Sequence, residues 1–73
     1  MKNKLKLLRA ERGITQDELA KILGITRPAL SNIETGKFSP KGRLVIKIAN
    51  YFGIPAEQIF FEDSVLQEEQ NVI

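Results

Sequence analysis

Arg27, Ser31 and Asn32 are the residues whose types and spacing could carry out recognition chemistry. On a helix they would share one side, while Leu30 and Ile33 would point the other way into a core. An arginine guanidinium can donate two parallel hydrogen bonds to O6 and N7 of guanine, and an asparagine amide can pair with N6 and N7 of adenine. The pattern therefore favours a surface that binds base edges, the alternative being an ordinary solvated face.

Thr26 and Pro28 specify the start of this helix. The Thr26 hydroxyl can accept a hydrogen bond from a backbone N–H of the first turn, and a proline in that turn removes no needed donor. Pro28 can contact a thymine methyl group or shape the start of the helix, but it donates nothing. We therefore expect sparse base readout from the helix at residues 26–35, supplemented by the deformability of the DNA.

Residues that carry acid–base catalysis or bind metals are scarce in this chain. Its 73 residues include no His and no Cys. There is no Gly-rich phosphate loop and no pair of carboxylates beyond surface acids. The sequence therefore predicts no enzyme activity and no cofactor, metal site or disulfide.

Charge is distributed unevenly along the chain. Residues 1–47 hold all eleven Lys and Arg beside four acids, a net charge of +7, whereas residues 48–73 hold five acids and no base, a net charge of −5. This asymmetry favours a polyanionic partner for the first part, although charge that merely keeps a small domain soluble is the competing explanation.

The N-terminal residues and the apolar stretches indicate where the protein resides. The start, MKNKLKLLRAERG, lacks the apolar segment of a signal peptide. No stretch approaches the roughly 20 apolar residues of a membrane helix. With no cysteine, the sequence fits a reducing compartment, and we expect a cytoplasmic protein without membrane contact.

Turn signals divide the chain into five short helices. Gly13, Gly24, Gly36 and Gly53 mark helix ends, and Thr15-Gln-Asp-Glu18 has the pattern of a capping box. No segment before residue 62 shows sustained alternation, so we predict an all-α domain without strands. The residues expected to face the core recur at helical spacing: Leu5, Leu8, Leu19, Ala20, Leu23, Leu30, Ile33, Val45, Ile48, Ala49, Phe52, Ile59 and Phe60.

The second and third helices are separated by Gly24-Ile25-Thr26. Two helices joined by a three-residue turn that contains glycine form a helix-turn-helix. Ala20 is small where the two helices would cross, and Ile25 can fill the turn. An unrelated helical hairpin could show the same pattern.

The segment LLRAERGITQDELAKILGITRPALSNIETGKFSP resembles the Cro and phage-repressor helix-turn-helix family, also called the xenobiotic-response-element type. The resemblance covers roughly residues 3 to 61. It implies a five-helix, lambda-repressor-like domain over residues 1–61 that binds operator DNA. The residues that carry it are Leu8-Arg9, Gly13-Ile14-Thr15-Gln16, Glu18-Leu19-Ala20, Leu23-Gly24-Ile25, Ser31-Asn32-Ile33-Glu34, Gly36-Lys37, Pro40, Lys47-Ile48-Ala49, Phe52-Gly53-Ile54 and Ile59-Phe60.

The same resemblance implies particular roles. Arg9 and Glu34 match positions that form a structural ion pair between the first and third helices. Pro28 departs from the family, which often has a polar residue there. Gly42 departs from a common large apolar residue, and we expect it inside the fourth helix. The predicted DNA-binding residues are Gln16, Thr26, Arg27, Pro28, Ser31, Asn32, Lys37, Lys41 and Arg43.

The C-terminal part is expected to mediate assembly. Because one recognition helix covers few base pairs, we predict a homodimer on a near-palindromic operator. The interface would use the fifth helix, the end of the fourth and the acidic tail at residues 62–73. An antitoxin-like or bridging protein, with the helix-turn-helix as scaffold and the tail as partner arm, is the alternative function. The candidate interface residues are Phe60, Phe61, Val65 and Leu66, with Val72 and Ile73 at the end.

Overall fold

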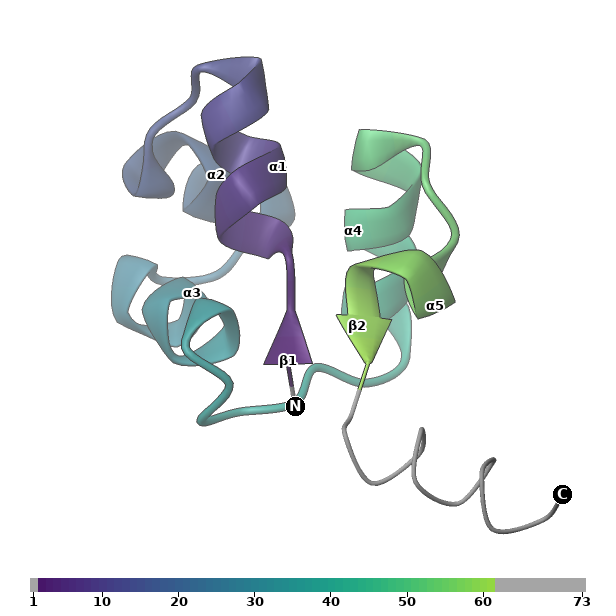
Figure 1. Ribbon diagram of the computed structural model, residues 1–73. Coiled ribbons are helices and arrows are strands. Elements are labelled where there is room, and N and C mark those ends of the chain that lie inside the picture. Colours follow the sequence, from purple (N-terminus) through teal and green to yellow (C-terminus); the bar gives the residue numbers. More distant parts are fainter. Residues whose placement is uncertain (1, 62–73) are drawn as a thin grey trace, which may run out of the picture.

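Five helices surround one core in the computed structural model, which describes residues 2–61. Helices α1, α2 and α3 form one side of the molecule and α4 and α5 the other (Figure 1). The predicted five-helix architecture is therefore confirmed. The helices are α1 Leu5–Arg12, α2 Gln16–Leu23, α3 Arg27–Glu34, α4 Arg43–Phe52 and α5 Ala56–Ile59.

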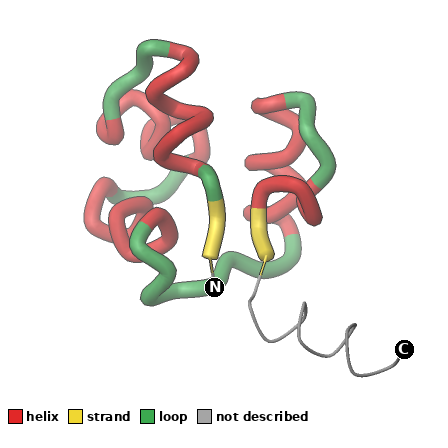
Figure 2. Tube along the Cα trace, in the orientation of Figure 1, coloured by secondary structure: helices red, strands yellow, loops and turns green. Residues whose placement is uncertain are grey.

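Two short strands correct the prediction that the domain has none. Strands β1 (Lys2–Asn3) and β2 (Phe60–Phe61) pair antiparallel, with Lys2 opposite Phe61 and Asn3 opposite Phe60. Figure 2 shows them between the two groups of helices. Strands of two residues are too short to show an alternating pattern, so periodicity could not reveal them.

Asn3 connects this small sheet to α1 and α3, which lie on the same side of it. Its Oδ1 accepts a hydrogen bond from the backbone N–H of Leu5 at 3.1 Å, at the start of α1. Its Nδ2 donates to the backbone carbonyl of Ile33 at 2.8 Å, near the end of α3. One side chain therefore joins β1 to the C-terminal turn of α3.

The predicted caps of α2 and α3 are confirmed. The Thr15 hydroxyl accepts from the backbone N–H of Glu18 at 3.1 Å, and the Glu18 carboxylate accepts from the backbone N–H of Thr15 at 2.8 Å. The backbone N–H of Thr15 stabilises the carboxylate and, with the Thr15 side chain, lowers the pKa of Glu18 below its ordinary value of 4.5. At α3, Thr26 Oγ1 accepts from the backbone N–H of Ala29 at 3.2 Å, with Pro28 in the first turn.

The prediction that Gly42 lies inside the fourth helix is wrong. Gly42 lies directly before α4. It has a φ of 59°, in the left-handed region that favours glycine. An added Cβ would have no heavy atom within 4 Å. The requirement for glycine here is therefore conformational, and no large side chain fills a gap at this point.

The core draws side chains from every helix. Leu5, Leu19, Leu30, Ile48 and Ile59 are completely buried. Ala20 is buried on α2, which packs against α3, as its small size predicted. The remaining buried core residues are Leu8, Leu23, Ile33, Phe52 and Phe60.

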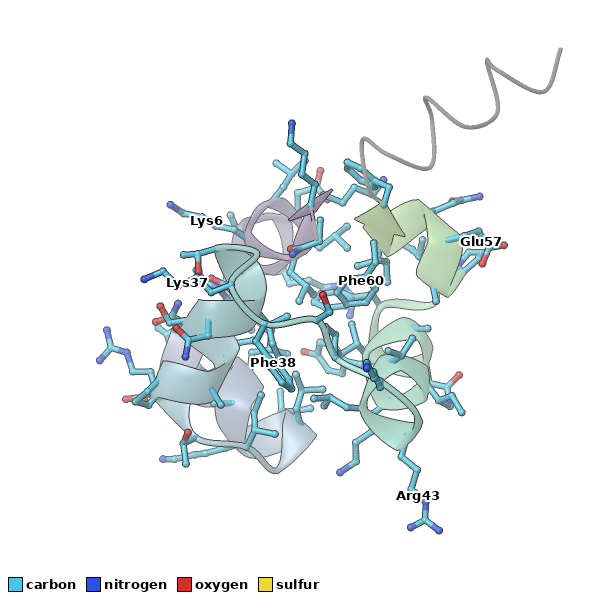
Figure 3. The ribbon with its side chains drawn as sticks, turned by 90° about the horizontal axis from the view of Figure 1, so that it is seen from below. Lys6, Lys37, Phe38, Arg43, Glu57 and Phe60 are labelled. Carbon is cyan, nitrogen blue, oxygen red and sulfur yellow. The ribbon has the colours of Figure 1, made fainter. Side chains whose placement is uncertain are left out.

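Phe60 faces the core, as its spacing predicts, but it lies in β2 rather than in the fifth helix. With only 9% of its surface exposed, it offers little to the dimer interface in which the sequence also places it. Figure 3 shows its ring among the side chains between the helices. Phe60 therefore belongs to the core of the domain.

Candidate nucleic-acid interface

The predicted recognition residues lie together on the outer side of α3. Thr26, Arg27, Pro28 and Asn32 are exposed, and Ser31 is half-buried. The opposite side of α3 faces the core. The helical period therefore identified the outward face correctly, while the binding of DNA by these residues stays a prediction.

The predicted ion pair between Arg9 and Glu34 is present. Arg9 Nε donates to Glu34 Oε2 at 2.9 Å, and Arg9 Nη2 lies 3.4 Å from Glu34 Oε1. Only 16% of the Arg9 side chain and 4% of the Glu34 side chain are exposed. Arg9 Nη1 also donates to the backbone carbonyl of Ile14 at 3.1 Å, so the pair joins α1, the following turn and the end of α3.

Gln16 extends this ion pair to the recognition surface. Its Nε2 donates to Glu34 Oε1 at 3.1 Å, and its Oε1 accepts from Arg27 Nε at 3.2 Å. An ionised carboxylate only accepts hydrogen bonds, so Glu34 fixes which end of the Gln16 amide faces it. The amide oxygen is consequently the atom that faces Arg27.

The Arg27 guanidinium donates one hydrogen bond, from Nε to Gln16, and its Nη1 and Nη2 atoms are available to an external acceptor. Within residues 2–61, its Nη1 and Nη2 atoms have no recorded hydrogen-bond partner. These are the two donors of a guanidinium that can form a parallel pair with guanine. The arrangement can therefore present a bidentate donor outward from the first turn of α3.

The sequence did not reveal this role of Gln16. We predicted that Gln16 contacts a DNA phosphate, whereas its amide bonds Glu34 and Arg27 in the structure. The second Nε2 hydrogen and the N-terminal end of α2 could still meet a phosphate, so that contact stays a prediction. The proximity of the three side chains depends on how three segments pack, which no local spacing shows.

A hollow of about 560 Å³ lies between α1, the start of α2 and α3. Lys6 is one of its lining residues, and our prediction omitted it. Its position three residues before Arg9, on the same face of a helix, was the available signal. The lining residues are Lys6, Arg9, Gly13, Ile14, Thr15, Gln16, Arg27, Ser31, Glu34 and Thr35.

The predicted phosphate-binding residues after α3 are all exposed, but they do not point the same way. Lys37 and Lys6 project to one side of the molecule, whereas Arg43 projects in another direction (Figure 3). The loop that carries Lys37 is tied to α3, because the backbone N–H of Phe38 donates to the carbonyl of Asn32 at 3.1 Å. Lys41 is exposed in the same connection.

Only two of the four expected interface residues, Phe60 and Phe61, lie within the described part of the chain. Phe61 is 41% exposed at the end of β2, in contrast to the buried Phe60. Val65 and Leu66 lie outside the described residues.

Within residues 2–61 there is no group of three or more His, Cys, Asp or Glu suited to a metal ion. The described helices include none long and apolar enough to cross a membrane.

Comparisons with known proteins agree with the helix-turn-helix fold. The HTH_3 model, described as helix-turn-helix, matches residues 5–59. An uncharacterized HTH-type transcriptional regulator of Methanocaldococcus jannaschii, MJ0272, is 50% identical over 64 residues, which cover 86% of this chain and 97% of that protein.

A phage protein and a solved structure extend the comparison. The immunity repressor protein of Bacillus phage phi105 is 31% identical over 67 residues, covering 92% of this chain and 46% of the repressor. The crystal structure of a transcriptional regulator from Listeria innocua has a TM-score of 0.72 at 17% identity, covering 99% of this chain and 77% of that one. The latter is a likeness of fold alone.

The ion pair leads to a prediction about stability. Glu34→Ala leaves the Arg9 guanidinium without its countercharge in a mostly buried position, so we expect a loss of about 3–5 kcal/mol in the free energy of unfolding. Urea denaturation followed by circular dichroism measures it. Glu11→Ala removes an exposed acid from α1 and serves as the matched control. Equal stability of the two variants would show that the pair is dispensable.

Proposed function

The chain belongs to the helix-turn-helix family of DNA-binding transcriptional regulators, and we propose that it is a repressor that inserts α3 into the major groove of its operator. The observation that carries the proposal is the exposed guanidinium of Arg27, held through Nε with Nη1 and Nη2 available. The similarity to the phage immunity repressor supports repression as the direction of control.

Base readout is assigned to the outer side of α3. Arg27 would donate to guanine O6 and N7, and Asn32 would pair with adenine N6 and N7. Thr26, Pro28 and Ser31 would lie against the groove with fewer hydrogen bonds to bases. Since Pro28 has no donor, DNA shape supplies part of the specificity.

Gln16 would prepare Arg27 for this contact. A long side chain that is ordered before binding loses less conformational entropy when it binds. The Gln16 oxygen restrains the Arg27 guanidinium, and the buried Glu34 carboxylate restrains Gln16 in turn. The Glu34 carboxylate, which stabilises the fold through Arg9, would thereby also contribute to DNA recognition through Gln16.

Phosphate contacts would fix the position of the domain on the duplex. Lys37, Lys41 and Arg43 are exposed cations that follow α3, and the N-terminal end of α2 favours an anion near Gln16. The Arg43 side chain projects away from Lys37 in Figure 3. Arg43 would have to turn its side chain to contact the same stretch of the DNA backbone as Lys37.

We also propose a cytoplasmic homodimer on a near-palindromic operator. Two recognition helices about 34 Å apart would meet successive turns of one groove. Phe61, α5 and the end of α4 are the described parts assigned to the interface. The division into a DNA-binding domain at residues 1–61 and a dimerisation or partner arm at residues 62–73 is part of the same proposal.

Salt dependence tests the proposed function. If each protomer neutralises about four phosphates, the dimer should show a log–log slope of binding constant against salt of about −7. Titration of a labelled operator fragment at several salt concentrations gives this slope. Binding that does not respond to salt would exclude the proposed interface.

Base recognition by Arg27 gives a second test. Arg27→Ala should relax the preference at one base pair and weaken binding to the best site by about 1–3 kcal/mol. Lys37→Ala is the matched control and should weaken all sequences alike, because a phosphate contact carries no base information. Selection from a random DNA pool distinguishes the two, and an unchanged motif for Arg27→Ala would contradict direct readout.

Assembly gives a third test. The full chain should sediment as a dimer, and truncation after Phe61 should weaken the association because it removes the proposed arm. The selected DNA should contain two half-sites about one turn apart. Monomers of both chains at high micromolar concentration, together with a single half-site, would rule out the dimer.

A further inference from the structure

The hollow beside α3 carries an excess of positive charge. Its lining includes three cations, Lys6, Arg9 and Arg27, and one carboxylate, Glu34. Arg9 is engaged by Glu34 at 2.9 Å, so these two charges compensate each other. Asp17 lines a smaller neighbouring pocket with Arg27 but not the hollow itself. Lys6 and Arg27 therefore remain as cations that no acid in the hollow neutralises.

Lys6 has no internal role that would account for its position. It is exposed on α1, and within residues 2–61 it has no recorded hydrogen bond or ion pair. Its neighbours in sequence have other roles, since Leu5 and Leu8 are buried in the core and Arg9 holds Glu34. Lys6 is consequently available to an external anion.

We propose that Lys6 binds a phosphate of the duplex that α3 enters, as a further DNA contact contributed by α1. This inference rests on the proposed insertion of α3. Lys6 lines the same hollow as Arg27 and Ser31, so a duplex against those residues brings its sugar–phosphate backbone close to that hollow. Lys6 and Lys37 also project to the same side of the molecule (Figure 3).

The chemistry of lysine determines what this contact contributes. A lysine ammonium is a compact charge on a flexible stem, suited to a phosphate oxygen rather than to a fixed pair of base atoms. A phosphate contact sets the position of the protein and adds affinity that is independent of sequence. Lys6 should therefore affect the salt dependence of binding and leave the preferred sequence unchanged.

The experiment compares Lys6→Ala with Lys21→Ala in the full chain. Each variant removes one exposed cation from a helix, but Lys21 does not line the hollow. Lys6→Ala should reduce the magnitude of the log–log salt slope by about 0.9 per protomer, and Lys21→Ala should leave it close to wild type. Lys6→Arg should retain the wild-type slope, because the charge remains.

Several outcomes would overturn the assignment. If wild type binds with the expected salt dependence and Lys6→Ala has the same slope, Lys6 is a solvated cation and the proposed function stands. If Lys21→Ala reduces the slope equally, net charge rather than a contact explains the effect. If Lys6→Ala changes the selected sequence, Lys6 contacts a base. A wild-type chain that binds no duplex overturns the proposed function together with this contact.

Circular dichroism of Lys6→Ala controls for folding. Alanine has a higher helix propensity than lysine, and Lys6 has no recorded partner within residues 2–61 to lose. The melting temperature should therefore be at least that of wild type. A large decrease would contradict the assignment, because it would show that Lys6 stabilises the fold.

Discussion

The buried carboxylate of Glu34 is the group on which both the fold and the recognition surface depend. It accepts from Arg9 and from Gln16, which lie on α1 and at the start of α2, while Glu34 itself ends α3. A nearly buried charge is tolerable only when paired and hydrogen-bonded. The three helices must therefore keep their relative positions for Glu34 to remain satisfied, and those same positions orient Arg27.

Local signals were sufficient for most of the helical structure. Thr15 and Glu18 are three residues apart, and Thr26 directly precedes its helix, so their capping roles follow from neighbouring residues. The ion pair joins residues 25 apart in sequence and was expected only from family resemblance. The two-residue strands were missed, because Lys2 meets Phe61 through the packing of the whole chain. In the same pairing Phe60 lies opposite Asn3, and its ring is buried in the core, whereas Phe61 stays exposed.

The candidate site was predictable in its outline but not in its internal contacts. Helical periodicity placed Arg27 and Asn32 on the outer side of α3, since burial of Leu30 on the other side fixes the rotation of the helix. The bonds of Gln16 depend on side-chain orientation across three elements, and one-dimensional spacing does not encode it. The sequence does not single out Lys6 for a related reason, because an exposed lysine is informative only once its neighbours in space are known.

The small sheet has a mechanical consequence. Force applied to the chain beyond Phe61 would load β2 first and then β1, since Phe60 pairs with Asn3. Asn3 would pass the load to the carbonyl of Ile33 at the end of α3. Traction on the C-terminal side of the domain would thus be transmitted to the end of α3, the helix that carries Arg27 and Asn32.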